Sequence, residues 1–423
     1  MSQDTVIDPN CLKHTNLNGL EDICIYEMMN KQFDVIRSPL SFLRIVLRIV
    51  KRIFISYEVT GDSDFVFFAS DYGICKRPDQ QQYFNNLCKT NTKAMCIMPS
   101  AHFKGININI LKNLRFLISW IGSFRKEGLS LKASFGLAVE ILKVKSDAEM
   151  IFSWMKYARI VVIYCDILPT DYYLTYLLNR RGIDTVTVMH GVYHRDFECD
   201  DYKFSHSRYF IANCDYAYDA AAFNGKKNII KGSMFQGIEE HTRYKHKKSF
   251  LFCLVLNKYI NKENDDNNRI LEFAELLAEE TQMRYVVRPH PGDWKNGFNY
   301  TGKHLKRISP PAEKFDDVVA GADLVVAISS TAYFQCVYNM IPIIRYKSES
   351  GIFFECNTDD CFTDYSEGLI IAERFLSMKQ DELLERRKKM FGQENAYKRY
   401  RHIFSLLAEE NLEENNILKE EIQ

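Results

Sequence analysis

Two polar side chains directly follow an apolar run in the second half of the chain. Residues 285–291 have the sequence YVVRPHP, in which Arg288 and His290 come after the apolar residues. The apolar run predicts a buried strand, and the two prolines end it, because proline has no backbone N–H to donate to a sheet. Ligands bind at the carboxyl edge of open α/β sheets. An arginine and a histidine at that edge suit a phosphate or diphosphate group.

A second apolar run ends in three hydroxyl side chains. Residues 323–332 have the sequence DLVVAISSTA, and Ser329, Ser330 and Thr331 open the helix that we predict next. Serine and threonine commonly cap helices, so capping alone accounts for them. The same helix start also presents backbone N–H groups and a positive dipole end to an anion. Together with the arginine and histidine of the first run, these hydroxyls predict one phosphate site built from two strands.

A third strand, in the first half of the chain, ends in His190 and Gly191. Residues 184–189 form the predicted strand, and His194 follows in a polar, aromatic loop. A histidine at this place can be a hydrogen-bonded core residue. At the ligand edge of a sheet it can instead act as general base or acid near neutral pH. His194 would then orient it or contact the substrate.

Two carboxylates are further candidates for a general base. Asp71 follows the predicted strand 64–70, and Asp166 holds the same position after the predicted strand 159–165. Aspartate is common in turns, so neither position requires a function. Each nevertheless lies where a parallel sheet binds its ligands.

The elements that position these side chains alternate as strand, helix and strand, which favours parallel sheets. The first series has strands at 64–70, 93–97, 159–165 and 184–189, with a helix at 170–182. The second series has strands at 249–256, 283–287, 323–328 and 341–345, with helices at 266–281, 313–320 and 331–339. We therefore predict an α/β fold of two Rossmann-like domains.

A chain of 423 residues is too long for one ordinary core, which also favours two domains. We place the first domain at 1–225, the second at 226–390 and a helical C-terminal segment at 391–423. The boundary falls in a polar stretch, 222–247, which is typical of a loop.

The composition excludes several classes of protein. The chain has 55 basic and 55 acidic residues, so its charge does not indicate a nucleic-acid partner. Its 12 cysteines form no CxxC pair, which favours free thiols in a reduced cytosolic compartment over disulfides or zinc. We see no signal peptide and no apolar stretch suited to crossing a bilayer, and expect a soluble or peripheral protein.

A basic and apolar segment at 40–55 has two interpretations. Arg44, Arg48 and Arg52 recur every fourth residue, so on a helix they form one charged stripe against aliphatic side chains. No acidic residue occurs from 35 to 57. The helix would either pack on a sheet with solvated arginines or lie on an anionic membrane surface. The basic residues within 112–126 would extend the same surface.

Several common catalytic motifs are missing from useful places. We find no GxGxxG, P-loop, HExxH or GxSxG motif, which excludes the usual dinucleotide, NTPase, zincin and esterase sites. The acidic pairs Asp200-Asp201 and Asp359-Asp360 are isolated, and we expect them to be solvated surface. No metal site is therefore predicted.

The His-Gly turn, the His-Pro turn and the Ser/Thr-rich helix start together resemble motifs of the GT-B glycosyltransferases of bacterial surface polysaccharide synthesis. The chain is similar in particular to the HP-motif group: capsular polysialyltransferases, Kdo transferases and the CDP-glycerol glycerophosphotransferases of teichoic acid synthesis. The resemblance covers roughly residues 60–400. It implies that an N-terminal acceptor domain and a C-terminal nucleotide-donor domain face each other across a cleft.

The resemblance also implies roles for the candidate residues. His290 would contact the donor phosphate, beside Arg288. The hydroxyls of Ser329, Ser330 and Thr331 would bind the remaining phosphate oxygens or the nucleotide.

The motifs that carry the general base match this chain only in part. His190 matches the histidine base in the Gln-His-Gly turn of the glycerophosphotransferases, but Met189 replaces the glutamine. The polysialyltransferases have an acidic Asp/Glu-Asp/Glu-Gly base motif, of which Asp71-Tyr72-Gly73 keeps the first and last elements.

We expect a transferase that moves a sugar from a nucleotide-activated donor to a surface glycan or lipid-linked acceptor at the cytoplasmic face of a bacterial membrane. Fixed cations and helix dipoles can stabilise the leaving phosphate, so we expect neither a metal nor a separate cofactor. The alternatives are a CDP-glycerol-type phosphopolyol transferase, a nucleotide-sugar epimerase and a catalytically silent subunit of a polysaccharide assembly complex.

Overall fold

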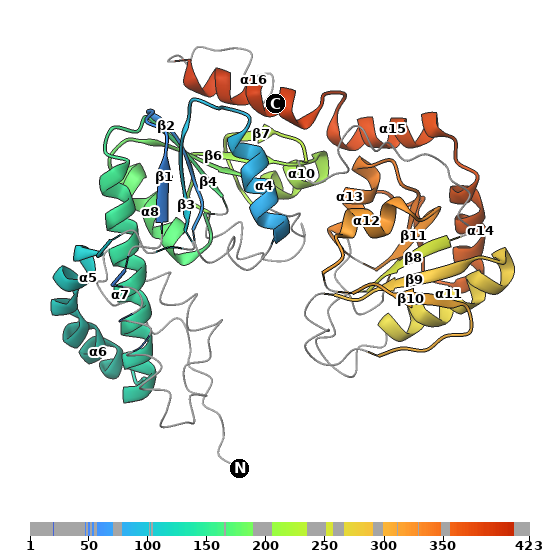
Figure 1. The fold of residues 1–423 in the computed structure, drawn as a ribbon, viewed down its shortest axis with the longest axis horizontal. Coiled ribbons are helices and arrows are strands. Elements are labelled where there is room, and N and C mark those ends of the chain that lie inside the picture. The colour runs from blue at the N-terminus through green and yellow to red at the C-terminus, as the bar shows by residue number, and fades with distance from the viewer. Residues whose placement is uncertain are drawn as a thin grey trace.

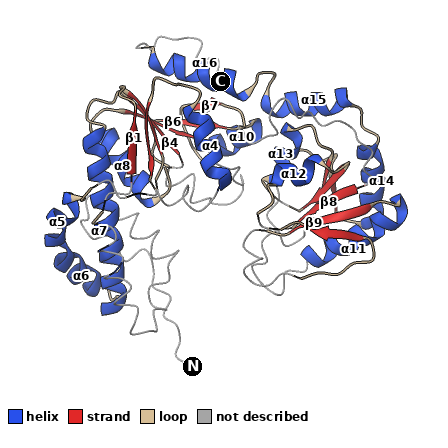
Figure 2. Ribbon diagram, viewed as in Figure 1, coloured by secondary structure: helices blue, strands red, loops and turns tan. Residues whose placement is uncertain are grey.

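A computed structural model describes the larger part of the chain, namely residues 57–70, 78–100, 105–164, 166–188, 205–234, 251–256, 266–290, 299–310, 312–328, 330–347 and 356–409, with residues 20, 47, 50, 53–54 and 102. Two α/β units lie side by side in it (Figure 1). Helices cover both faces of each sheet (Figure 2).

Within the described residues, the first sheet has seven strands in the order β1-β3-β2-β4-β5-β6-β7. Strand β1 is antiparallel to β3, and the other neighbours are parallel. Apolar and β-branched residues fill the central strands, as expected for a sheet that is covered on both faces. The strands are β1 (Tyr57–Thr60), β2 (Phe65–Phe68), β3 (Met95–Pro99), β4 (Ile160–Tyr164), β5 (Asp184–Val188), β6 (Tyr209–Ala212) and β7 (Ile229–Lys231).

The helices of the first domain pack on opposite faces of this sheet. Their bounds are α4 (Pro78–Cys88), α5 (Ile108–Asn113), the 3-10 helix η3 (Leu114–Phe116), α6 (Leu117–Lys126), α7 (Leu131–Trp154), α8 (Pro169–Arg180) and α10 (Asp215–Phe223). Side chains alternate along β2, so Val66 and Phe68 join the core formed with α7 and α8. Phe65 and Phe67 join the core formed with α4 on the other face.

The second sheet has six parallel strands in the order β10-β9-β8-β11-β12-β13 within the described residues. Its strands are β8 (Leu251–Val255), β9 (Arg284–Arg288), β10 (Leu305–Ile308), β11 (Leu324–Ala327), β12 (Ile343–Tyr346) and β13 (Cys361–Phe362). Its helices are α11 (Asp266–Thr281), α12 (Phe315–Ala320), α13 (Ala332–Tyr338), α14 (Tyr365–Leu376) and α15 (Gln380–Phe391). Helices α11 and α14 share a core with one face, and α12 and α13 share a core with the other.

The last described helix, α16 (Ala396–Ala408), returns to the first domain. The ring of Phe404 packs edge-on against Phe65 and Phe67, with centroids 5.5 and 5.3 Å away. The hydroxyls of Tyr400 and Tyr83 lie 3.3 Å apart in the same core. The helical C-terminal segment therefore belongs to the packing of the first domain, although it follows the second domain in the chain.

The two domains also share a core. Helix α10 of the first domain packs with α13 and α15 of the second, and the rings of Tyr216 and Phe334 lie 5.8 Å apart. The predicted fold class, two Rossmann-like α/β domains with a helical C-terminal segment, is confirmed. The predicted boundary at 225 differs from the structure, because β7 at 229–231 pairs with β6 and completes the first sheet.

Two further expectations concern thiols and membranes. Six cysteines in the described part of the chain are free thiols: Cys88, Cys96, Cys214, Cys336, Cys356 and Cys361. Among the described helices, none combines the length and apolar character needed to cross a bilayer. Of the segment 40–55, Leu47 and Val50 are helical, and most of the rest lies outside the described residues.

Candidate functional site

The carboxyl edge of the second sheet brings the two predicted phosphate-binding runs together. Arg288 pairs with Val255 of β8, and Val255 pairs with Ala327 of β11. The ends of β9 and β11 are thus separated by one strand, a distance of about 10 Å at ordinary strand spacing. His290 follows Arg288 by two residues, and Ser330 follows Ala327 by three. Side chains reaching from both strand ends can contact one diphosphate group across this interval.

Arg288 is held in place by the loop after the edge strand β10. Its side chain is half-buried, and Nη1 donates to Ser309 Oγ and to the carbonyl oxygen of Pro310, each at 2.8 Å. Ser309 is fully buried, so it provides a rigid partner. His290 is half-buried as well and follows the buried Pro289. These contacts fix a cation at the strand end and orient the residues that follow it.

The hydroxyl residues before α13 differ from each other. Ser330 is half-buried, and its Oγ accepts the backbone N–H of Ala332 at 3.3 Å, so it caps the helix. Thr331 is exposed and makes no side-chain capping bond. A hydroxyl that accepts a bond keeps its own O–H as a donor, so Ser330 can cap the helix and bind an anion at once.

The remaining predicted site residues lie outside the described residues. These are Asp71, His190, Gly191, His194 and Ser329. Their assignment as catalytic or substrate-binding residues stays a prediction. The acidic pair Asp200-Asp201 also lies outside the described residues.

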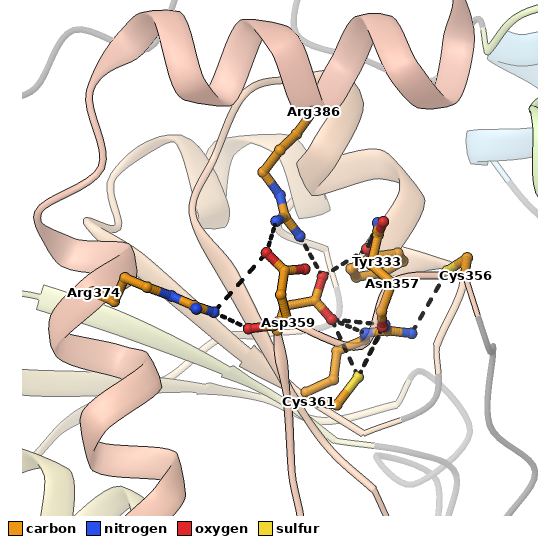
Figure 3. Close-up of polar contacts among 9 residues, drawn as sticks. Tyr333, Cys356, Asn357, Asp359, Cys361, Arg374 and Arg386 are labelled. Atoms are coloured by element: carbon orange, nitrogen blue, oxygen red, sulfur yellow. Dashed lines mark hydrogen bonds and ion pairs between the residues drawn. The ribbon is translucent and has the colours of Figure 1, made fainter.

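A buried charge network lies at the same sheet edge, beyond β11 (Figure 3). Arg345 ends the apolar part of β12, and its side chain and that of Asp360 are both 0% exposed. Arg345 Nε and Nη2 donate to Asp360 Oδ1 at 2.9 and 2.7 Å. The prediction that Asp359-Asp360 is solvated surface is therefore wrong for Asp360. Its carboxylate is buried because it neutralises an arginine that the sheet itself buries.

Two further donors bind the other oxygen of Asp360. The Tyr333 hydroxyl and Arg386 Nη2 donate to Oδ2 at 2.7 and 2.6 Å. The Arg345 guanidinium also lies over the Tyr333 ring, 3.9 Å from its centroid. Burial lowers the pKa of Arg345, but the nearby Tyr333 and Asp360 outweigh it and raise that pKa overall. Tyr333 lies in the first turn of α13, so this network fixes the helix start that carries Ser330.

Sequence reasoning missed this network because no local motif marks it. One signal was available: residues 341–346 have the sequence IPIIRY, which places an arginine in an otherwise apolar strand. An arginine is almost never fully buried without a partner, so this position required a buried acid.

Asp166, at the carboxyl edge of the first sheet, has a structural role. Its Oδ2 accepts bonds from the hydroxyls of Ser205 and Ser207 and from the backbone N–H groups of His206 and Ser207, at 2.7–3.0 Å. These contacts anchor the residues that lead into β6. The four donors occupy Oδ2 and hold this carboxylate in a structural role.

Asp171 is a second buried acid at this edge, and sequence reasoning did not select it. It lies in the first turn of α8 with a fully buried side chain, beside Ser70 at the end of β2. Neither carboxylate oxygen has a geometrically satisfactory hydrogen-bond partner within the described residues. Burial raises its pKa well above the ordinary value, while Ser70 opposes the shift. Burial therefore shifts the titration of this carboxyl toward its protonated form.

We expect the Asp171→Asn variant to gain stability relative to the wild type as the pH rises. A carboxyl group with a raised folded-state pKa stabilises most below its unfolded value of 3.8 and loses that contribution as the pH rises toward the folded-state pKa. Asparagine has no such loss. Urea unfolding at a series of pH values measures the difference. Asp62→Asn, at an exposed aspartate, is the control, and a pH-independent difference for Asp171→Asn would contradict the assignment.

No group of His, Cys, Asp or Glu residues that could hold a metal ion occurs within the described part of the chain. The donors at the second sheet edge are a guanidinium, an imidazole and hydroxyls. Such a set suits an anion rather than a metal cation.

The fold is that of an α/β protein with two Rossmann-like domains. No protein-family model and no curated protein sequence matches the chain. Among solved structures, it is similar to the UDP-GlcNAc 2-epimerase of Methanocaldococcus jannaschii in complex with UDP-GlcNAc and UDP, at 15% identity and a TM-score of 0.47, covering 81% of this chain and 98% of that one.

Two other structures show a comparable likeness. S. aureus MnaA, solved with UDP, has 11% identity and a TM-score of 0.49, with 82% of this chain and 96% of that one covered. The spinosyn rhamnosyltransferase SpnG has 10% identity and a TM-score of 0.44, with 80% and 99% covered. At these identities and scores, the similarity concerns the fold alone.

Proposed function

We propose that this protein is a glycosyltransferase that moves a sugar from a nucleotide-activated donor to a surface glycan or a lipid-linked acceptor. The observation that carries the proposal is the shared carboxyl edge of β9 and β11, two strands with only β8 between them. Arg288 and His290 lie at the end of β9, and Ser330 and Thr331 follow β11. A cation, an imidazole and two hydroxyls within reach of one diphosphate suit a donor nucleotide.

The chemistry of transfer uses these donors at the leaving group. The acceptor hydroxyl attacks the anomeric carbon, the bond from that carbon to the phosphate oxygen breaks, and its electron pair stays on the phosphate. Arg288 and the hydrogen-bond donors of His290 and Ser330 would stabilise the charge that develops there. This arrangement supplies the positive charge from side chains, so we propose a reaction that needs neither a metal nor a separate cofactor.

The proton of the acceptor hydroxyl requires a base from the first domain. We keep His190 and Asp71 as the proposed bases, each following a strand of the first sheet. Asp166 accepts four hydrogen bonds, which give it a structural role at the edge of the first sheet. The proposed setting is the cytoplasmic face of a bacterial membrane, where a lipid-linked acceptor is within reach.

A thermal-shift screen with CMP, CDP, UDP and GDP tests the proposal. We expect one nucleotide to stabilise the protein by about 2.7 kcal/mol at a hundredfold excess over its Kd. Arg288→Gln should abolish that shift, measured against the variant's own unliganded Tm. The matched control is Arg284→Gln, at the exposed start of the same strand. No stabilisation by any nucleotide would instead favour a silent subunit.

Product analysis separates the enzymatic alternatives. A transferase releases the nucleotide only when an acceptor is present. An epimerase converts the nucleotide sugar into a second nucleotide sugar without release, and a phosphopolyol transferase releases CMP from a CDP-linked polyol. Incubation of the stabilising donor with and without acceptor therefore decides among the three.

A further inference from the structure

Helices α5 and α6 lie on the outer side of α7, away from the second domain (Figure 1), and they carry an unusual apolar surface. It is formed by α5, η3 and α6. Ile108 is 61% exposed, Leu111 is 53% exposed and Ile118 is 83% exposed. Large aliphatic side chains exposed together in this way typically mark an interaction site.

The opposite side of these helices is well packed, so the exposure is a fixed property of the fold. Ile110, Trp120 and Phe124 are buried against α7. Asn113 Nδ2 donates to Ser146 Oγ at 3.1 Å and to Glu149 Oε2 at 2.8 Å, both on α7. The helices therefore cannot rotate to bury their exposed face without breaking this core.

The surface continues to Ile53 and Phe54, which end the basic segment of the sequence. Phe54 forms an isolated antiparallel bridge with Ile106, and Asn107 N donates to the carbonyl oxygen of Ile53 at 2.6 Å. Ile106 and Phe54 are themselves exposed, as are Leu47 and Val50 nearer the N-terminus. The two apolar stretches, far apart in the sequence, are joined at this point.

The charges of both stretches have one sign. The sequence contains no acidic residue between Asp79 and Glu127, whereas Lys112, Arg115, Arg125 and Lys126 all occur there. The segment 35–57 likewise contains basic residues and no acid. The whole chain has a net charge of zero, so this excess of positive charge is segregated.

We propose that the surface formed by α5, η3 and α6 docks on an anionic lipid bilayer. Ile108, Leu111 and Ile118 would enter the boundary between headgroups and acyl chains, and the neighbouring basic residues would contact lipid phosphates. Apolar side chains flanked by lysine and arginine are typical of helices that lie in the plane of a membrane surface. The inference goes beyond sugar transfer and does not depend on it.

A second copy of the chain fits this surface less well. A symmetric pair would place the basic residues of both copies against each other, and like charges across an interface oppose association. An anionic bilayer supplies both the apolar phase and the opposite charge. The bilayer is therefore the occupant that the charge pattern favours.

Liposome flotation of the full chain tests the proposal. We expect the wild type to float with vesicles of phosphatidylcholine and phosphatidylglycerol and to stay mostly unbound with phosphatidylcholine alone. The double variant Leu111→Glu, Ile118→Glu should lose about tenfold in bound fraction, because it places carboxylates against the anionic surface. Ile370→Glu, at a 71% exposed isoleucine in α14 of the second domain, should float like the wild type.

Two results would overturn the proposal. One is equal flotation of the wild type and the Leu111→Glu, Ile118→Glu variant. The other is a concentration-dependent dimer in light scattering that this variant abolishes, which would assign the surface to a second copy. All substituted side chains are exposed, so thermal melts should show unchanged folding. The nucleotide-induced shift should also be unchanged in the variant, which keeps this test separate from the proposed transfer activity.

Discussion

Replacing Asp360 with alanine should lower the free energy of unfolding by about 3–5 kcal/mol, the cost of removing one partner of a buried ion pair. The substitution leaves the Arg345 guanidinium, 0% exposed, without its carboxylate. It also removes the acceptor of the Tyr333 hydroxyl and of Arg386 Nη2. Urea unfolding followed by circular dichroism measures the loss.

The neighbouring Asp359 provides a matched control. Its side chain is 47% exposed, and it binds the same Arg386 through Nη1 at 2.5 Å. Exposed ion pairs contribute about 0–1 kcal/mol, so Asp359→Ala should cost far less than Asp360→Ala. If both variants lost the same free energy of unfolding, burial of the Arg345–Asp360 pair would make no contribution to stability. The double variant Arg345→Met, Asp360→Leu should regain part of the loss, because it removes both buried charges.

The network also affects the candidate site. Tyr333 lies three residues after Ser330 and donates to Asp360, so the carboxylate holds the first turn of α13 against the sheet. Arg386 extends the same contact to α15, which packs near α10 of the first domain. The buried ion pair thus supports the start of α13, which carries Ser330 of the proposed phosphate site.

The parts of the fold that could be predicted from the sequence have strong local patterns. Helix α11 was predicted at 266–281 and has those bounds, because its apolar positions recur at helical spacing after an acidic start. Strands β4 and β11 were predicted to within one or two residues, since both are continuous apolar runs. Such runs are buried on both faces of a parallel sheet and carry a clear signal.

The missed elements lack such a signal. Strand β7 has three residues, and β10 has the sequence LKRI with its central lysine and arginine exposed at the sheet edge. Their strand character depends on pairing with neighbours far along the chain. Asp360 was misjudged for the same kind of reason: its burial depends on Arg345, fifteen residues earlier, and on Tyr333 and Arg386.

The second large effect is expected at the proposed phosphate site. His290→Ala should reduce transfer by about 10²–10³-fold, the range measured when one donor that stabilises a developing negative charge is removed. Ser330→Ala should have an effect in the same direction. The side chain of His290 is half-buried at the end of the sheet, so its removal should cost little stability. Steady-state kinetics with the donor identified by thermal shift, alongside a thermal melt of each variant, measures both quantities.

The division of the loss between kcat and KM decides what these side chains do. A donor that acts on the departing phosphate lowers kcat and kcat/KM together, whereas one that only binds the ground state raises KM and leaves kcat unchanged. The control is His402→Ala, which replaces an exposed histidine on α16. This variant should keep wild-type rates. If His290→Ala and Ser330→Ala also kept wild-type rates, the leaving group would have to lie elsewhere. If the double variant His290→Ala, Ser330→Ala transferred sugar as fast as His290→Ala alone, the two side chains would act together on the same phosphate oxygens.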